Sequence, residues 1–306
     1  IILKVQPSPM DETLNEVNIA KAGATIVGLL SPHSHSEYMD KAISKNLSTI
    51  AMELVPRVTK AQSMDVLSSQ SNLAGYRAVI EACYYYDRAF PMMMTAAGTV
   101  NPAKVLVIGV GVAGLQAIAT AKRLGAAVSA YDVRAATKEQ VESLNAKFIY
   151  PAAGVVDRED KSGYAKEVTK DFAAIQEEFL LGIIANFDVV ITTAQIPGKK
   201  APILVTKNMV SKMKLGSVIV DIATATGGNV EDSVIDKIIS KKGVKIIGWS
   251  ATATRVASDA SKLYAKNLYN FLEYAVKDGK IDFSDDIVEE MLIGKDGKMM
   301  NKKFKV

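Results

Sequence analysis

One stretch of the 306-residue sequence decides the fold, Lys104-Val105-Leu106-Val107-Ile108-Gly109-Val110-Gly111-Val112-Ala113-Gly114. Apolar residues typical of a buried strand lead into three glycines at the G-x-G-x-x-G spacing. The first glycine permits a tight turn, the second lets a pyrophosphate approach the backbone, and the third lets the next helix pack closely. That helix is expected from Ala113 to Leu124, and its free N–H groups and dipole favour a phosphate at its start. Glycines at such a turn also occur for packing reasons alone.

The next predicted strand supports a nucleotide site. It runs from Ala127 to Tyr131 and is followed by Asp132, 23 positions after Gly109, where the dinucleotide fingerprint has its ribose-binding acid. A carboxylate there accepts hydrogen bonds from both ribose hydroxyls and repels a 2′-phosphate, so we expect NAD(H) rather than NADP(H). Arg134 follows closely, and an arginine at this place can instead bind a 2′-phosphate. The predicted cofactor-binding residues are Gly109, Gly111, Val112, Gly114, Asp132, Val133, Arg134, Tyr164 and Ala194.

Composition excludes several classes of protein. The sequence is 49% hydrophobic and 23% charged, which is typical of a globular chain long enough for two domains. The net charge of +4 comes from 37 basic and 33 acidic residues mixed along the chain, so no nucleic-acid partner is expected. The single cysteine, Cys83, excludes a disulfide framework and favours a reducing compartment. No apolar run approaches the roughly 18 residues that a membrane-spanning helix needs.

Strand-like and helix-like stretches alternate along the chain, which predicts an α/β protein of two Rossmann-like, doubly wound domains. The first domain is expected to comprise residues 1–66 and 256–306, and residues 67–255 are expected to form the NAD-binding domain. Two long helices are expected to join the domains and to leave a cleft between them. Because the sequence begins inside an apolar strand without an initiator methionine, we expect an amino-terminal part of the first domain to be missing.

Finer expectations follow from periodicity and turn residues. In the first domain a parallel sheet is predicted from strands at 3–5, 25–30 and 49–54, with helices at 11–21 and 36–44. A terminal hairpin is predicted around Asp296-Gly297. In the second domain the predicted strands are 105–108, 127–131, 187–192, 217–222 and 244–248.

The segment from Arg57 to Asp65 contains side chains suited to the nicotinamide end of the cofactor. Gln62 and Asp65 can hold a carboxamide, and Arg57 can bind a phosphate or carboxylate bidentately. An exposed loop followed by a helix cap is the alternative, with Ser63 or Asp65 accepting hydrogen bonds from terminal N–H groups. The residues alone leave both interpretations open.

A long polar connection, residues 151–166, lies inside the predicted NAD-binding domain. Loops of this length often act as lids or binding elements, so we expect Tyr164 to fold over a bound nucleotide. A disordered surface loop is the alternative.

His33 and His35 are the two histidines of the sequence. No further ligands accompany this pair, so no metal site is predicted. A histidine general base is also poorly supported. Hydride transfer between two nicotinamides needs orientation, proximity and exclusion of water rather than such a base.

Several longer runs carry a resemblance to a known family. They are residues 57–65, Asn72-Leu73-Ala74-Gly75-Tyr76-Arg77-Ala78-Val79, Ala121-Lys122-Arg123-Leu124-Gly125-Ala126, Lys138-Glu139-Gln140-Val141-Glu142-Ser143, Gly163-Tyr164-Ala165-Lys166-Glu167 and Ile196-Pro197-Gly198-Lys199. Over nearly its whole length the chain resembles the NAD(H)-binding component, domain I of the alpha subunit, of proton-translocating NAD(P)+ transhydrogenases. These enzymes belong to the alanine dehydrogenase/transhydrogenase family.

The resemblance implies a catalytic set at the nicotinamide end, made of Arg57, Gln62, Asp65 and Ser68. It also implies that Asp132 binds the adenosine ribose and that Tyr164 belongs to a mobile loop. NADH bound here is expected to give its hydride to NADP+ on a separate domain, coupled to proton passage through a transmembrane domain. The expected assembly is a homodimer at the soluble side of a bacterial plasma membrane or an organelle inner membrane.

Two departures from the family pattern stand out. Sequence that normally precedes the first strand is expected to be missing, and Thr224-Ala225-Thr226 stands where the family usually has a more acidic and amide-bearing pattern. The threonines at 224 and 226 are expected to change local contacts of this segment but not the fold.

Two other functions compete with this interpretation. Alanine dehydrogenases resemble the chain in architecture, but their lysine and histidine after two first-domain strands correspond to Gln6 and Ser31 here. A catalytically silent NAD-sensing module would keep Asp132 and the glycines but would need neither Gln62 nor Tyr164.

Overall fold

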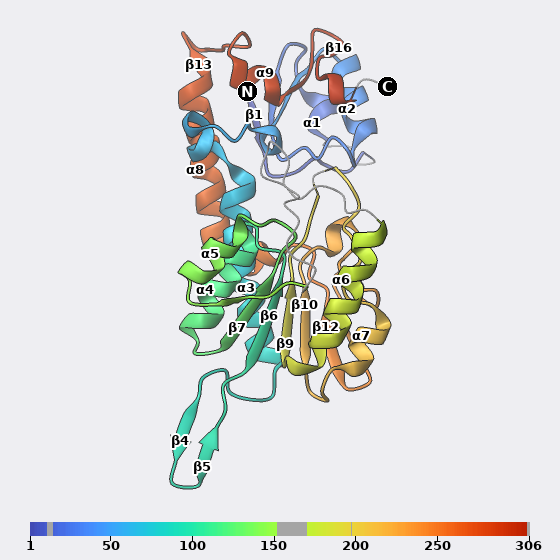
Figure 1. Ribbon diagram of the computed structural model, residues 1–306. Helices are drawn as coiled ribbons and strands as arrows, with labels where there is room; N and C mark the ends of the chain where they lie inside the picture. Colours follow the sequence, from blue (N-terminus) through green and yellow to red (C-terminus); the bar gives the residue numbers. More distant parts are fainter. Residues whose placement is uncertain (11–14, 152–169, 197, 305–306) are drawn as a thin grey trace. The chain divides into compact units, whose positions relative to one another are not determined.

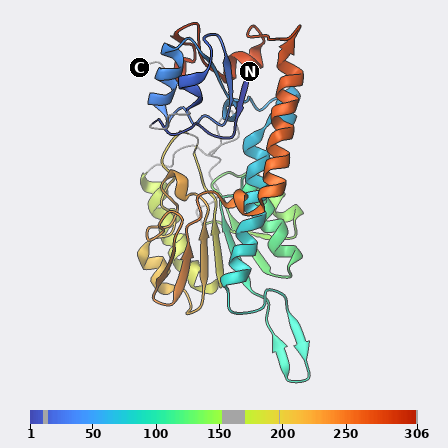
Figure 2. The ribbon, with the colours of Figure 1, turned by 180° about the vertical axis from the view of Figure 1, so that it is seen from behind.

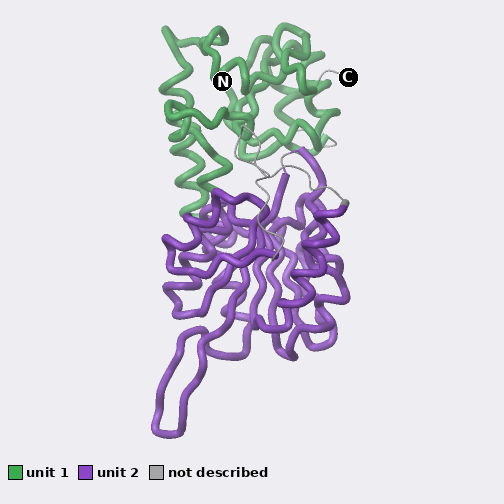
Figure 3. Tube along the Cα trace, in the orientation of Figure 1, with its two compact units in different colours: residues 1–70, 258–306 green, residues 71–257 purple. Residues whose placement is uncertain are grey.

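The computed structural model describes residues 1–10, 15–151, 170–196 and 198–304 (Figure 1). The chain divides into two compact units (Figure 3). Unit 1 comprises Ile1–Gln70 and Ser258–Val306, and unit 2 comprises Ser71–Ala257. The chain passes between the units within the long helix α3 (Val66–Tyr85) and again at the start of α8 (Ala257–Ala275).

Unit 2 contains a seven-stranded sheet among its described residues, in the order β11-β12-β10-β9-β6-β7-β8. The strands are β6 (Lys104–Ile108), β7 (Ala127–Tyr131), β8 (Lys147–Phe148), β9 (Val189–Thr192), β10 (Val218–Asp221), β11 (Ile238–Lys241) and β12 (Val244–Ile247). All neighbouring pairs are parallel except β11 with β12. The strand order reverses between β6 and β9, which makes the carboxyl ends of these two strands the topological switch point.

Helices cover both faces of this sheet (Figures 1 and 2). On one face α3, α4 (Val112–Arg123) and α5 (Thr137–Ser143) pack with Val105 and Val107, and on the other α6 (Lys170–Ile183) and α7 (Lys207–Lys212) pack with Leu106 and Ile108. Successive side chains of a strand point to opposite faces, so a strand buried on both sides is apolar throughout. This is why β6 reads as a continuous hydrophobic run.

Unit 1 is a smaller sheet in the order β1-β2-β3-β15-β16 among its described residues. Its elements are β1 (Ile2–Lys4), α1 (Glu16–Ile19), β2 (Thr25–Gly28), α2 (Ser36–Ser44), β3 (Ser48–Ala51), α9 (Asp286–Met291), β15 (Leu292–Lys295) and β16 (Lys298–Met299). Val27 and Ile50 pack with α8 and α9 on one face, and Ile26 packs with α1 and α2 on the other. A short hairpin, β13 (Val276–Lys277) with β14 (Lys280–Ile281), follows α8.

Three expectations for the first domain need correction. Its sheet is parallel only from β1 to β3, because the predicted hairpin at Asp296-Gly297 pairs β15 antiparallel to β3. The strand expected to reach Leu54 ends at Ala51 and continues as a 3-10 turn, η1 (Met52–Leu54). The described part of the helix expected over 11–21 is only α1, which begins after Asn15, whose side chain accepts a hydrogen bond from Val17 N.

A hairpin that the sequence did not predict projects from unit 2 (Figures 1 and 2). Its strands are β4 (Met93–Thr95) and β5 (Gly98–Val100), paired antiparallel. The side chains of Met92, Met93 and Met94 are 59%, 43% and 78% exposed. A run of exposed apolar side chains on one projecting element is unusual for a surface that faces only water.

The buried carboxylate of Glu81 forms hydrogen bonds that connect the first helix of unit 2 with its last residues. Glu81 on α3 is 2% exposed and accepts hydrogen bonds from Arg77 Nε at 2.8 Å, Arg255 Nη1 at 3.3 Å and Trp249 Nε1 at 3.1 Å. The Arg255 guanidinium lies 3.9 Å from the centre of the Trp249 ring. Arg255 lies in η5 (Thr252–Val256), so the last turn of unit 2 is fixed to α3 by charged and aromatic contacts.

Candidate functional site

The glycine-rich turn after β6 has the geometry of a phosphate cradle. A Cβ atom at Gly114 would lie 1.9 Å from the Gly109 carbonyl oxygen, so this close packing of α4 against the turn requires glycine. Gly109 has φ +94°, and a Cβ there would lie 2.9 Å from Ala194 N. Gly111 caps α4 ahead of Val112, and a Cβ there would meet no described atom within 4 Å. Two glycines are therefore needed for packing, and the middle one borders open space where a phosphate can reach the backbone.

Asp132 lies against this turn at the end of β7. Its carboxylate is buried, with 6% of the residue exposed, and accepts hydrogen bonds from Val110 N at 2.6 Å and Arg134 N at 2.9 Å. Arg134 also donates from Nε and Nη2, each at 2.8 Å, to the two carboxylate oxygens. The structure thus brings together the predicted residues Asp132, Arg134 and the turn, with Val133 half-buried between them. Arg134 is bound to Asp132, which disfavours the alternative in which it awaits a 2′-phosphate.

The other side of the turn is formed by the chain that follows β9. The hydroxyl of Thr193 donates to the Gly109 carbonyl at 2.8 Å. The next residue, Ala194, donates its N–H to Asn229 Oδ1 at 3.0 Å and accepts a hydrogen bond from Asn229 Nδ2 at 2.9 Å. The structure therefore places Ala194, one of the predicted cofactor-binding residues, beside Gly109, where it is held by an asparagine that sequence reasoning missed.

A second buried carboxylate, Asp221, supports this side. It ends β10, is 0% exposed and accepts hydrogen bonds from Thr192 Oγ1 at 3.2 Å, Ala223 N at 3.0 Å, Asn229 N at 2.9 Å and Val230 N at 3.2 Å. Burial raises the pKa of Asp221 above its usual value, and the backbone hydrogen bonds act in the opposite direction. Sequence reasoning also missed this residue. The available signal was an aspartate at the end of an apolar strand, followed eight residues later by Asn229.

The threonines in the segment that departs from the family pattern make local contacts. Thr224 and Thr226 lie in the 3-10 turn η4 (Thr224–Thr226). Thr224 Oγ1 donates to the Gly248 carbonyl at 3.2 Å, and Thr226 Oγ1 donates to the Ala223 carbonyl at 3.0 Å. The departure therefore leaves the turn after β10 well bonded.

The residues predicted for the nicotinamide end lie in unit 1, around the start of α3. Asp65 Oδ1 accepts a hydrogen bond from Ser68 N at 2.9 Å, and its other oxygen accepts one from Ser68 Oγ at 2.5 Å, so Asp65 caps the helix. Arg57 and Gln62 are exposed, on either side of the start of η2 (Thr59–Met64). The structure brings Asp65 and Ser68 together. Tyr164 lies outside the described residues.

The segment before α3 is fixed from α8. Asn267 and Asn270 both donate from Nδ2 to the Ser63 carbonyl at 2.9 Å. Two amides on one carbonyl hold the backbone around Gln62 in place without using its side chain, which leaves the exposed amide of Gln62 at a defined position.

Gln6 and Ser31, the residues expected to replace the lysine and histidine of alanine dehydrogenases, follow two strands of unit 1. Gln6 is exposed after β1, and Ser31 follows β2 with a left-handed φ of +45°. Its N–H donates to the carboxylate of Glu53, which also accepts from Leu30 N at 3.2 Å. These contacts fix the backbone and supply neither an amine nor an imidazole.

The described residues hold no cluster of three or more side chains suited to a metal ion. His33 packs on the ring of Phe304 with centroids 4.5 Å apart, and His35 Nδ1 lies 3.3 Å from the Ser31 carbonyl oxygen. Both histidines therefore have local partners in unit 1.

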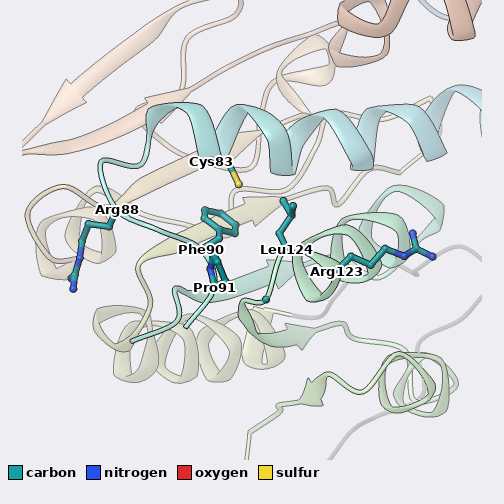
Figure 4. Close-up of a pocket in the computed structure, with 7 residues that line it drawn as sticks. Cys83, Arg88, Phe90, Pro91, Arg123 and Leu124 are labelled. Atoms are coloured by element: carbon teal, nitrogen blue, oxygen red, sulfur yellow. The ribbon is translucent and has the colours of Figure 1, made fainter. Parts of the chain in front are cut away.

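A separate pocket of about 520 Å³ lies at the base of the projecting hairpin (Figure 4). It is lined by Cys83, Arg88, Phe90, Pro91, Arg123, Leu124 and Gly125. Figure 4 shows Cys83, Phe90 and Leu124 facing the same space, whereas Arg88 and Arg123 extend away from it. Burial raises the pKa of the Cys83 thiol to about 11, which keeps it protonated and unreactive. The pocket lies beyond the carboxyl end of α4, whereas the glycine turn lies at its amino end.

Comparison with known proteins identifies the relatives of this chain. Residues 1–74 match the family model of the alanine dehydrogenase/PNT N-terminal domain, and residues 78–302 match the model of the C-terminal domain. The first part of the divided NAD(P) transhydrogenase subunit alpha of Rickettsia prowazekii is 62% identical over 98% of this chain and 78% of its own length. The protein of the same name from Rhodospirillum rubrum is 52% identical over 98% of this chain and 80% of its own length.

Solved structures agree with these matches. The transhydrogenase from Sinorhizobium meliloti is 47% identical, with a TM-score of 0.84, over 99% of this chain and 79% of that one. An L-alanine dehydrogenase matches with a TM-score of 0.78 at 21% identity, over 99% of this chain and 80% of that one, which shows a shared fold. On the matches to both domain models and to these relatives, the chain belongs to the alanine dehydrogenase/PNT family.

Proposed function

We propose that this chain is the NAD(H)-binding component of an NAD(P) transhydrogenase, in which NADH bound to unit 2 gives a hydride to NADP+ held on a separate domain. The observation that carries the proposal is the glycine turn with Asp132 bonded to Val110 N inside it. That arrangement presents backbone N–H groups to a pyrophosphate and a carboxylate to a ribose. The names of the relatives that share half or more of its residues support the choice of reaction.

The reaction needs little acid–base chemistry from the protein. A reduced nicotinamide supplies the hydride, and its transfer to NADP+ leaves NAD+ and NADPH without a net proton. The chain's task is to bind, orient and exclude water. We assign orientation of the nicotinamide end to Arg57, Gln62, Asp65 and Ser68, and closure over the nucleotide to Tyr164. Asp65 and Ser68 cap α3 through their own hydrogen bonds, as in the alternative interpretation of this segment, so the assignment is supported by the exposed positions of Arg57 and Gln62.

The names of the same relatives support a wider assembly. We propose that the chain works with an NADP(H)-binding domain and a transmembrane domain of the same enzyme, and that hydride transfer is coupled to proton translocation. The chain would then be a peripheral part on the soluble side of the membrane. No helix in the described part of the chain is long and apolar enough to span a bilayer.

We further propose that two copies of the chain pair through the hairpin β4–β5. The exposed methionines at 92–94 support this, because flexible apolar side chains suit a contact surface. Replacing Met93 and Met94 with serine is expected to convert a dimer to a monomer in sedimentation experiments without lowering the melting temperature. Leu215→Ser, at a residue that is 84% exposed in the turn between α7 and β10, is the matched control. A dimer that survives the double replacement would contradict this pairing.

The reaction is tested by mixing the chain with a separately produced NADP(H)-binding domain, NADH, and an NADP+ analogue whose reduced form absorbs at a shifted wavelength. We expect reduction of the analogue only when both proteins are present. Gln62→Asn is expected to abolish transfer while NADH binding is retained, whereas Gln140→Asn on the exposed face of α5 changes neither. Alanine-dependent reduction of NAD+ by the chain alone would favour alanine dehydrogenase instead. Binding without any transfer would favour an NAD-sensing module.

A further inference from the structure

The candidate site has two sides that meet at the switch point of the unit 2 sheet. A dinucleotide lies across such a point, with one mononucleotide over each half of the sheet. Asp132 follows β7 and marks the adenosine half. The chain after β9, Thr193 and Ala194, begins the other half, over which the nicotinamide mononucleotide would lie. A Cβ at Gly109 would lie 2.9 Å from both Ala194 N and Thr193 Oγ1, so this chain contacts the turn directly.

One buried side chain fixes both ends of the segment that forms this half. Asn229 is 0% exposed, and its amide makes two hydrogen bonds to Ala194, one at 3.0 Å and one at 2.9 Å. The same amide donates from Nδ2 to the Pro202 carbonyl at 2.8 Å. Asn229 therefore links two points of the chain, Ala194 and Pro202, that are eight residues apart.

The backbone of Asn229 is itself held rigidly. Its N–H donates to Asp221 Oδ2 at 2.9 Å, and its carbonyl accepts from Leu204 N at 2.8 Å and Val205 N at 3.0 Å. The preceding Gly228 has φ +80°, and a Cβ there would lie 2.8 Å from Asp221 Oδ2. Because the backbone and the side-chain amide of Asn229 are both hydrogen-bonded, the side chain holds Ala194 at a fixed position relative to the sheet.

We propose that Asn229 is a positioning residue for the nicotinamide half of the bound dinucleotide, acting through Ala194. The inference rests on the proposed function of unit 2 as the NAD(H) site. Because the N–H of Ala194 is already used by Asn229, Ala194 meets the cofactor as a fixed surface rather than as a hydrogen-bond donor. Without the amide, Ala194 loses both of its hydrogen bonds to Asn229, and the bond from Gln195 Nε2 to the Ile222 carbonyl at 3.3 Å remains. Asp132 and the glycines keep their contacts.

The test compares two ligands that share the adenosine half. The Kd values of NADH and of 5′-AMP are measured by calorimetry for the wild-type chain, Asn229→Ala and Asn229→Ser. Both variants are expected to weaken NADH binding about tenfold or more, because Ala194 is no longer held in place beside the nicotinamide half. The Kd of AMP is expected to stay within about twofold of the wild-type value. Asn208→Ala, at an exposed position on α7, is the control and is expected to change neither value.

AMP binding also reports whether unit 2 is folded in each variant. Equal weakening of both ligands, or loss of AMP binding in both variants, would assign Asn229 to general stability and overturn the proposal. Unchanged NADH binding would overturn it as well. The hydride-transfer assay stays separate, because a wild-type chain that binds NADH without transferring hydride contradicts the proposed function and leaves the comparison of NADH with AMP intact.

Discussion

Two buried aspartates end strands of the unit 2 sheet, and their partners differ. Asp132, at the end of β7, is bonded to Val110 N in the turn and to the guanidinium of Arg134. Asp221, at the end of β10, is bonded to backbone N–H groups and the hydroxyl of Thr192, so its described donors are all neutral. Both carboxylates end parallel strands of one sheet, at the edge where ligands of such sheets bind.

The difference separates the carboxylate of Asp132, which can exchange hydrogen-bond partners, from the carboxylate of Asp221, which cannot. The Arg134 side chain is partly exposed, and under the proposed function we expect ribose hydroxyls to replace part of its hydrogen bonding to Asp132. The donors to Asp221 are mainly backbone groups of the turn after β10, and they cannot leave without unfolding that turn. We therefore expect the Asp132 side to exchange partners with a ligand and the Asp221 side to stay rigid. Four experiments test this contrast.

The largest effect is expected from Gly114→Ala, which disturbs the turn that Asp132 contacts through Val110 N. The new Cβ would lie 1.9 Å from the Gly109 carbonyl oxygen, so the turn and α4 must separate. We expect unfolding free energy to fall by about 4 kcal/mol and NADH binding to be lost. The control is Gly182→Ala in α6, where a Cβ meets no described atom within 4 Å. Denaturant titration and calorimetry measure both, and retained NADH binding in Gly114→Ala would contradict the close packing.

Asp221→Asn tests the rigid side. An asparagine offers one acceptor oxygen and places an NH2 group against backbone N–H donors, so unfolding free energy is expected to fall by about 3 kcal/mol. Asp87→Asn is the control, because the Asp87 side chain is 76% exposed and its ion pair with Lys245 is worth less than about 1 kcal/mol. Equal losses in the two variants, measured by urea unfolding, would remove the distinction between the aspartates.

Asp132→Asn tests the exchangeable side. Loss of the charge weakens the contact with the ribose and releases Arg134, so NADH is expected to bind about tenfold more weakly while NADPH binds more tightly. Asp171→Asn, an exposed carboxylate on α6, serves as control. The measurement is the Kd of each nucleotide by fluorescence titration. If the preference for NADH over NADPH is unchanged, Asp132 does not set specificity.

The smallest effect is expected in unit 1. There Glu16 accepts hydrogen bonds from a charged donor, Lys4, and from a neutral donor, Tyr38. Burial opposes its charge, but hydrogen bonds from Ser8, Tyr38 and Lys4 outweigh burial and lower the pKa of Glu16 to about 2. Because the folded pKa lies below the unfolded value of 4.5, this contribution is complete above pH 4.5 and is lost as pH falls towards 2. Glu16→Gln should flatten that dependence in unfolding experiments. A wild-type slope that persists in the variant would assign it to other groups.

The parts of the fold predicted from sequence were those with local signals. The strand expected at 105–108 is β6, Lys104–Ile108, and the helix expected at 113–124 is α4, Val112–Arg123. A buried parallel strand and the glycines after it leave a pattern within a dozen residues, and Asp132 follows at a spacing set by the βαβ unit. The roles of the predicted nicotinamide-side residues stay predictions.

The missed parts depend on partners far away in the chain. Asn229 bonds Ala194, 35 residues earlier, and nothing near position 229 marks that contact. The antiparallel edge of the unit 1 sheet pairs Leu292 with Ile50. The hairpin β4–β5 was missed for another reason, since a hairpin exposed on both faces has no alternation of apolar and polar residues to find.

The cluster around Glu81 contains an intrinsic fluorophore, Trp249. Trp249 is the single tryptophan of the sequence, so selectively excited indole emission comes from one place in the molecule. That place lies between the hydrogen bond to Glu81 and the stacked guanidinium of Arg255, just before the chain leaves unit 2. Charged groups this close shift and quench indole fluorescence. Changes at the end of unit 2 during nucleotide binding can therefore be followed in the unlabelled protein, without introducing a dye or a new cysteine.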